Sequence, residues 1–153
     1  MDLLTAVMKA DLAEVRRLLE AGAAIDAADS DSRTALMHAV IDGPAELVSL
    51  LLEMGADPNL QDGQGFSPLH FAAQEQRPEV ARLLLGGGAE VDIADRNGNT
   101  PLARAIFSSR GRGQVIRILL CEGADRLREN NFGISPLKLA RSIANYDLED
   151  LLS

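Results

Sequence analysis

A period of 33 residues is the feature of this sequence that most limits what the chain can fold into. Leucine, alanine and glycine each recur with this period, at Leu3, Leu36, Leu69 and Leu102; Ala6, Ala39, Ala72 and Ala105; Gly22, Gly55 and Gly88. The next copies, Leu137, Ala140 and Gly123, come after 35 residues, which places the two extra residues between Phe107 and Gln114. Such a period is typical of a solenoid, in which each unit buries its core against its neighbours.

Each unit carries the signals of two helices. A hydroxyl residue precedes the first helix at Thr34, Ser67, Thr100 and Ser135, because its oxygen can accept a hydrogen bond from an unpaired N–H group. Proline follows at Pro68, Pro101 and Pro136, where a missing N–H costs nothing. The second helix carries a leucine-rich stripe and ends before the repeated glycine, which suits a left-handed C-terminal cap. Turns such as residues 95–98, Asp-Arg-Asn-Gly, favour a hairpin between units.

These motifs resemble the ankyrin repeat. Residues 67–73, Ser-Pro-Leu-His-Phe-Ala-Ala, are similar to the family's Thr-Pro-Leu-His motif, and residues 55–59 and 88–92 are similar to its Gly-Ala-Asp-Val-Asn ending. The resemblance implies an all-α solenoid of stacked helix pairs joined by β-hairpin-like loops. We divide the chain into five units that form one domain: 1–28, 29–61, 62–94, 95–129 and 130–153. The first and last units are expected to be caps, so that the chain would be a complete small solenoid.

Composition agrees with this fold and restricts the partner. The 153 residues are a one-domain length, and 46% are hydrophobic, which is enough for a continuous core. The net charge of −8 repels phosphates and argues against nucleic acid as a partner. The excess lies in residues 1–65, which hold 12 acidic and four basic side chains. This part is either a solubilising surface or a patch for a basic partner.

The location of the protein is predicted from three features. The single cysteine, Cys121, cannot form a disulfide within the chain, which favours a reducing compartment. No apolar run approaches the roughly 20 residues of a membrane-spanning helix. The N-terminus lacks the basic and apolar segments of a secretory signal. The sequence therefore predicts a cytoplasmic protein that does not associate with membranes.

Catalytic patterns are not found in the sequence. The resemblance implies that His70 braces the repeat, while His38 is expected to be packed or half exposed. Neither histidine has a second ligand at the spacing of a metal site. No base stands beside Cys121, and the run of glycines at 86–88 ends a helix rather than preceding one, unlike a phosphate-binding loop. We therefore predict a protein that is not an enzyme and has no metal or other cofactor.

The resemblance implies that partners contact the hairpin tips and the exposed ends of the first helices, on the concave side. These residues, with two arginines of the insertion, are Asp31, Arg33, Ile41, Asp42, Gln64, Phe66, Gln74, Glu75, Arg96, Asn97, Asn99, Arg104, Phe107, Arg110, Arg112 and Phe132. The loop over 107–114 is either a tolerated insertion or a contact whose arginines meet carboxylates of the partner.

The aromatic residues of this set allow two interpretations. Phe66, Phe107 and Phe132 are either hot spots for a partner or side chains that pack on the neighbouring hairpin, and Phe107 is the best candidate for a true contact. Arg104 is expected either to pair with Glu75 or to contact the partner.

The sequence thus predicts a non-catalytic protein–protein interaction module, most simply a stoichiometric inhibitor that is a monomer on its own. Small ankyrin proteins include kinase inhibitors and bacterial immunity proteins. Because an acidic N-terminal half suits a basic toxin, we favour an immunity protein. A scaffold or adaptor and a kinase-inhibitor-like regulator are the alternatives. An enzyme or small-ligand-binding protein and a self-assembling repeat are further hypotheses.

Overall fold

The computed structural model describes residues 1–143 and 148–152, and its regular structure is helical. Within these residues ten helices follow one another: α1 (Leu3–Met8), α2 (Leu12–Glu20), α3 (Ala35–Asp42), α4 (Ala45–Glu53), α5 (Pro68–Gln74), α6 (Pro78–Gly86), α7 (Pro101–Phe107), α8 (Gln114–Cys121), α9 (Pro136–Ser142) and α10 (Glu149–Leu152). The described residues contain no β-strand, and one isolated bridge joins Ala28 to Thr34. The predicted all-α fold is confirmed. None of these helices has the length and apolar character needed to span a membrane.

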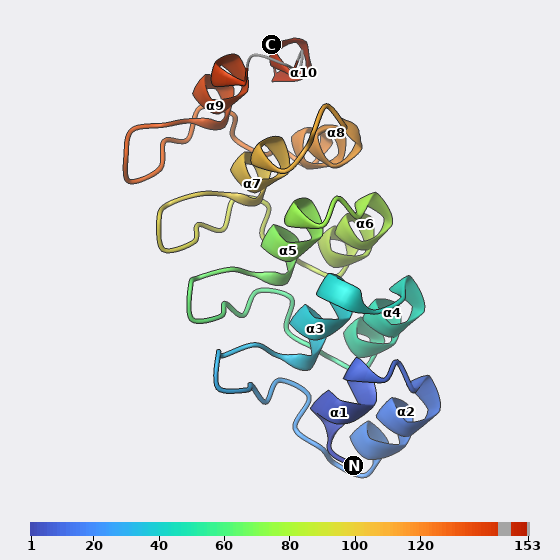
Figure 1. Ribbon diagram of the computed structural model, residues 1–153. Coiled ribbons are helices and arrows are strands. Elements are labelled where there is room, and N and C mark those ends of the chain that lie inside the picture. The colour runs from blue at the N-terminus through green and yellow to red at the C-terminus, as the bar shows by residue number, and fades with distance from the viewer. Residues whose placement is uncertain (144–147, 153) are drawn as a thin grey trace.

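The helices stack in two columns (Figure 1). The odd-numbered helices, which we call the inner helices, contact one another in chain order, and so do the even-numbered outer helices. Each inner helix also contacts the outer helix that follows it. Long loops, which we call the hairpins, lead into α3, α5, α7 and α9 and project to the left in Figure 1, beside the inner helices. This is the predicted solenoid, and we call each helix pair with its preceding hairpin a repeat.

The helices begin and end where the sequence signals predicted. In α3, α5, α7 and α9 the hydroxyl of the N-cap residue accepts a hydrogen bond from the backbone N–H three residues further on. Proline occupies the first turn of α5, α7 and α9. After the outer helix α6, Gly88 has a φ of +100°, the left-handed conformation that a residue without a Cβ adopts most easily.

The core lies between successive repeats. The repeated leucines Leu36, Leu69 and Leu102 are completely buried, and so are the repeated alanines. Small alanines let the inner helices approach closely, while leucines from both columns fill the space between them. The inner helices are thereby held at a fixed spacing, which also fixes the spacing of the hairpins.

The two extra residues of the fourth repeat form a compact turn between α7 and α8. Ser109 is buried, and its carbonyl accepts a hydrogen bond from the Arg112 N–H at 2.9 Å. Its Oγ accepts a hydrogen bond from the Gly111 N–H at 3.4 Å. Arg110 has a φ of +49°. This turn leaves the side chains of Arg110 and Arg112 exposed close to Phe107.

Candidate functional site

The hairpins are shaped by an acidic or amide side chain that recurs with the repeat, at Asp29, Asp62, Asp95 and Asn130. In each hairpin one oxygen of this side chain accepts hydrogen bonds from two backbone N–H groups, at distances of 2.9 to 3.0 Å. The pKa of Asp29 is lowered, chiefly by the hydrogen bond from the Arg33 backbone and next by His38. The sequence interpretation missed this function of the four residues, although their spacing follows the repeat.

Neighbouring hairpins are joined through their backbones. One hydrogen bond links each pair: Gly63 N–H to the Asp31 carbonyl at 2.9 Å, Arg96 N–H to the Gln64 carbonyl at 3.1 Å, and Asn131 N–H to the Asn97 carbonyl at 2.9 Å. The predicted contact residues Asp31, Gln64, Arg96 and Asn97 are exposed at these tips. Their side chains are therefore available to a partner, while their backbones hold the hairpins in register.

His70 joins α5 to the next hairpin. Its Nδ1 accepts a hydrogen bond from the Ser67 N–H at 3.1 Å, so Nε2 carries the proton and donates to the Asn99 carbonyl at 2.8 Å. Burial lowers the pKa of the imidazole. The bracing role that the resemblance implied for His70 is confirmed. His38 is half-buried, as expected, with its Nε2 lying 2.8 Å from Oδ2 of Asp29.

Cationic and aromatic side chains contact one another in a row along the inner helices and hairpins. The guanidinium of Arg33 lies 5.2 Å from the ring centroid of Phe71, which meets the ring of Phe66 edge-on at 5.5 Å. Arg104 lies 4.8 Å from the centroid of Phe66 and 5.9 Å from that of Phe107. We call Arg33, Phe71, Phe66, Arg104 and Phe107 the cation–aromatic ladder. Contacts of this kind contribute about 0.5–1 kcal/mol each at exposed sites.

The ladder decides between two of the alternatives left open by the sequence. Phe66 is half-buried and packs on the rings of His70 and Phe71 in α5 of its own repeat, not on the neighbouring hairpin as the packing alternative had it. The expected ion pair between Arg104 and Glu75 is wrong, because the guanidinium lies over Phe66 and 3.7 Å from Oδ2 of Asp95. Asp95 is buried and belongs to the same repeat as Arg104, so it offers a nearer and less hydrated partner charge.

Phe107 and Phe132 differ from Phe66 because they are mostly exposed. The exposed fraction is 69% for Phe107 and 73% for Phe132. Phe107 is the last residue of α7, and Phe132 belongs to the hairpin that follows α8. Aromatic residues, phenylalanine among them, are enriched at protein interfaces relative to the rest of the surface.

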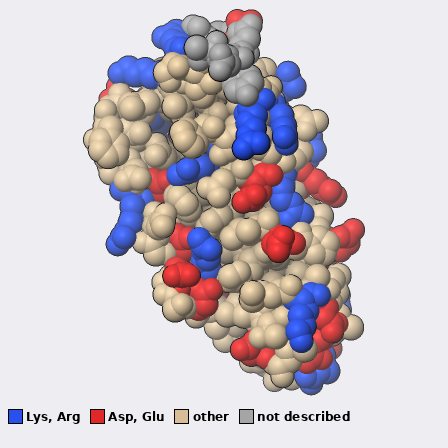
Figure 2. Space-filling view, viewed as in Figure 1, with Lys and Arg blue, Asp and Glu red and all other residues tan. Residues whose placement is uncertain are grey.

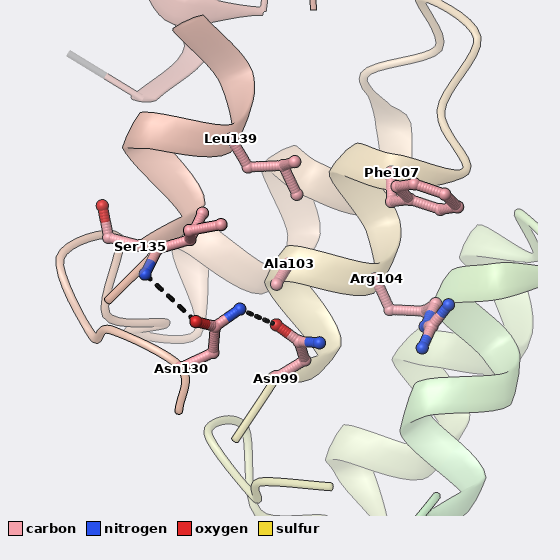
Figure 3. A pocket seen from close by; sticks show the side chains of 8 residues that line it. Asn99, Ala103, Arg104, Phe107, Asn130, Ser135 and Leu139 are labelled. Atoms are coloured by element: carbon pink, nitrogen blue, oxygen red, sulfur yellow. Dashed lines mark hydrogen bonds between the residues drawn. The ribbon is translucent and has the colours of Figure 1, made fainter. Parts of the chain in front are cut away.

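An open pocket of about 170 Å³ lies between α7 and α9 (Figure 3). Ala103 and Leu139 face each other across it, Phe107 stands at one end, and Asn99 and Asn130 lie at the other. The two asparagines are paired, since Nδ2 of Asn130 donates to Oδ1 of Asn99 at 2.9 Å. The pocket is therefore apolar along its walls and polar at one end.

A second hollow, of about 380 Å³, also has Phe107 in its wall. Its other lining residues are Gln74, Glu75, Gln76, Ser108, Arg110 and Arg112, which come from the end of α5 and from the inserted turn. Phe107 is thus an exposed ridge between an apolar pocket and a charged hollow. The structure brings together five of the residues predicted as contacts here: Gln74, Glu75, Phe107, Arg110 and Arg112.

The remaining predicted contacts lie nearer the N-terminus. Ile41 and Asp42 line a third hollow, of about 210 Å³, between α1 and α3. Arg33 also borders this hollow, and its Nε lies 3.4 Å from Oδ2 of Asp62 in the next hairpin. On the face drawn in Figure 2, basic side chains gather over the C-terminal repeats at the top, and acidic side chains are more frequent below them. The charge asymmetry of the sequence is therefore visible on the folded surface.

Chemically reactive groups do not converge in the described residues. No three His, Cys, Asp or Glu side chains among residues 1–143 and 148–152 lie close enough together to hold a metal ion. Cys121 is exposed at the end of α8. What the inner helices and hairpins offer is a surface with hydrogen-bonding, charged and apolar positions.

Comparison with known proteins identifies one family. A family model described as ankyrin repeats, in three copies, matches residues 3–62 and 55–130. Together these matches extend from α1 through α8 into the hairpin before α9. None of the curated proteins matches the chain.

Proposed function

Because the chain belongs to the ankyrin-repeat family, whose members are generally protein–protein interaction modules, we propose that it is a non-catalytic, stoichiometric inhibitor of a partner protein. The partner binds the inner face, which we define as the hairpin tips and the inner-helix residues beside them. The binding module is one domain of five units, 1–28, 29–61, 62–94, 95–129 and 130–153, with the first and last as caps. The protein is a monomer before it binds and acts in the cytoplasm.

The exposure of Phe107 is the observation that carries this proposal. Phe66 and Arg33 belong to the same ladder, but each contacts a side chain of the next repeat, Arg104 and Phe71 respectively, whereas Phe107 contacts Arg104 of its own helix and is otherwise largely open. An aromatic ring flanked by two hollows offers a partner an apolar anchor with polar groups around it, which is the usual composition of a binding hot spot.

The narrower form of the proposal is an immunity protein that neutralises a toxin. It is supported by the 12 acidic and four basic side chains of residues 1–65, which would attract a basic toxin such as a nuclease. A scaffold is the second candidate, and it requires two partners bound at once. Phe107 belongs to α7 and Phe132 to the hairpin before α9, and these two elements line one pocket together, which favours one binding site and one partner.

The test is isolation of the partner from the cells in which the protein occurs. The full chain is used as bait, the captured proteins are identified by mass spectrometry, and the stoichiometry is measured by light scattering. We expect one partner at a ratio of one to one and loss of the partner's activity in the complex. Asn97→Arg, which places a charge on an exposed hairpin tip, should weaken capture, whereas Arg82→Glu on the exposed side of α6 should not.

Three results would contradict the proposal. The first is the failure to recover any protein at stoichiometric amounts. The second is a complex that survives Asn97→Arg but is lost with Arg82→Glu, which would place the site on the outer helices. Two proteins bound at the same time would replace the inhibitor by a scaffold.

A further inference from the structure

We propose that the segment of the partner that covers Phe107 is acidic and hydrophobic. A large apolar side chain, most favourably an aromatic ring, enters the pocket between α7 and α9. A carboxylate close to it in the partner's sequence lies in the hollow with Arg110 and Arg112. This inference rests on the proposed function and adds the chemistry of the partner's segment.

Two rings of the preceding repeat have no counterparts at the pocket. On the side of α5 that faces the next repeat, Phe66 stacks on His70 with ring centroids 5.7 Å apart, the guanidinium of Arg104 lies over Phe66, and Nε2 of His70 donates to the Asn99 carbonyl. One period later these two positions hold Asn99 and Ala103, which are shorter and carry no ring. Arg104 borders the pocket, but its guanidinium is directed toward the preceding repeat (Figure 3). An incoming ring would therefore replace side chains that the repeat itself supplies one layer earlier.

The size and walls of the pocket suit an apolar side chain. Its volume is about 170 Å³, and four of the eight residues that line it are apolar: Ala103, Phe107, Ile134 and Leu139. An apolar cavity of about 150 Å³ is large enough to hold a benzene ring. A leucine, methionine or phenylalanine side chain would bury its own surface here and cover part of Phe107 at the same time.

The polar end of the pocket calls for an acceptor on the partner. Asn130 is saturated, since its Oδ1 accepts two backbone N–H groups and its Nδ2 donates to Asn99. The amide N–H₂ of Asn99 makes no hydrogen bond within the described residues, so it remains as a donor. A backbone carbonyl next to the apolar side chain would satisfy it.

The charge of the second hollow selects a carboxylate. Arg110 and Arg112 are both exposed there, and neither forms an ion pair among the described residues. Glu75 is the one acidic residue in its lining, so the hollow carries a net positive charge. A protein segment that crosses Phe107 meets an apolar pocket on one side and two guanidinium groups on the other. A basic segment would be repelled at this point.

The first experiment asks what sequence the full chain selects. A library of random peptides displayed on phage is panned against the immobilised protein. We expect enrichment of peptides in which Phe, Leu or Met lies within a few residues of Asp or Glu. A peptide carrying the enriched motif is then labelled, and its dissociation constant is measured by fluorescence anisotropy.

Variants assign the binding to the two hollows. Phe107→Ala should weaken peptide binding at least about tenfold, the size expected for a hot spot. The control Leu127→Ala truncates a large apolar side chain that is 61% exposed and lines neither hollow, so it should change the affinity less than about twofold. Arg110→Gln/Arg112→Gln should weaken binding at least about fivefold and reduce its salt dependence. Arg82→Gln/Arg117→Gln, a double change on the outer helices α6 and α8, is the charge control.

Ala103→His tests the pocket itself. The new side chain stands where His70 stands one repeat earlier, within reach of the Ile134 carbonyl that corresponds to that of Asn99. It should fill the pocket and abolish peptide binding while leaving thermal stability unchanged or higher. Because the variant repeats a residue that the fold already accommodates, a loss of binding cannot be attributed to unfolding if the melting temperature is retained.

The inference is overturned if no acidic–hydrophobic motif is enriched, or if the selected peptide binds Phe107→Ala and Ala103→His as tightly as the original chain. Equal affinity for 4-phenylbutyrate, an apolar carboxylate without a peptide backbone, would also overturn it, because the site would then be one for small molecules. Failure of this inference leaves the proposed function standing if a partner is still captured and is lost with Asn97→Arg. If the selected peptide binds but no stoichiometric partner is captured, the acidic–hydrophobic preference of the site is supported and the proposed function is contradicted.

Discussion

Replacing Leu69 by alanine should lower the free energy of unfolding by about 4 kcal/mol, and the same change at Leu3 should cost about half as much. The two residues occupy the same position of the repeat. Leu69 is completely buried in α5, which packs between α3 and α7. Leu3 lies in α1, whose inner-helix neighbour among the described residues is α3 alone, and it is 8% exposed.

The magnitude follows from the atoms removed and the space they leave. Leucine loses three carbon atoms, worth about 0.8 kcal/mol each, or about 2.4 kcal/mol in total. A cavity of about 70 Å³ adds about 1.7 kcal/mol at about 24 cal/mol per Å³. At Leu69 the helices on both sides keep this cavity open. At Leu3 the end of the stack can relax into it, so the second contribution largely disappears.

Urea unfolding followed by far-UV circular dichroism measures both changes, since the chain has no tryptophan to serve as a probe. The slope of the transition must be the same in both variants, because a stack of repeats can lose its cooperativity and unfold in parts. A cost below about 1 kcal/mol for Leu69→Ala would contradict the assignment of this leucine to the space between layers. Equal costs at the two positions would refute the claim that repeats stabilise one another from both sides.

Two further predictions concern bonds between repeats. The stability of the protein should fall as the pH drops below about 6.5. Burial lowers the pKa of His70 in the folded state, so in this pH range the unfolded chain binds a proton at His70 and the folded chain does not. The loss should continue until the pH passes the folded pKa, and urea titrations across this range should show a flatter pH dependence for His70→Gln. Arg77→Ala should cost about 1–3 kcal/mol, because the carbonyls of Ala39 and Val40 lose the guanidinium donor that lies 3.3 and 2.8 Å away. Arg82→Ala on the exposed side of α6 should stay within about 0.5 kcal/mol in the same assay.

Local features of the fold could be predicted from the sequence because their causes are local. Thr34 and Ser67 cap helices through bonds that span three residues, and Gly88 ends α6 because of its own backbone conformation. A repeat makes such signals stronger, since each is seen several times. The bracing by His70 could be expected for the same reason, as it follows from the position of the residue in the motif.

Contacts between side chains that depend on how hairpins and inner helices come together could not be predicted in the same way. Arg104 pairs with Asp95 and not with Glu75 because the folded hairpin brings the carboxylate of Asp95 within 3.7 Å of the guanidinium, and this approach has no sequence signal. Phe66 is likewise covered by the guanidinium of Arg104, which lies 38 residues further along the chain and 4.8 Å from the centroid of the ring. The hydrogen bonds of Asp62 and Asp95 within their hairpins could have been predicted. These residues recur with the period of the repeat, and the sequence interpretation missed only their role.

The same comparison explains why the candidate site lies beside α7 and not elsewhere on the inner face. At α5 the rings of Phe66 and His70 lie on the side that faces the next repeat, and His70 also donates a hydrogen bond to the next hairpin. Beside α7 the corresponding Ala103 supplies neither the ring nor the bracing bond, and the pairing of Asn99 with Asn130 links the repeats without filling the volume. The stack is therefore held together at this layer while its surface stays incomplete. The fourth repeat thus keeps a hydrogen bond to the next repeat but leaves an apolar pocket beside the exposed Phe107. Stability alone does not account for this pocket, whereas binding of a side chain from another protein does.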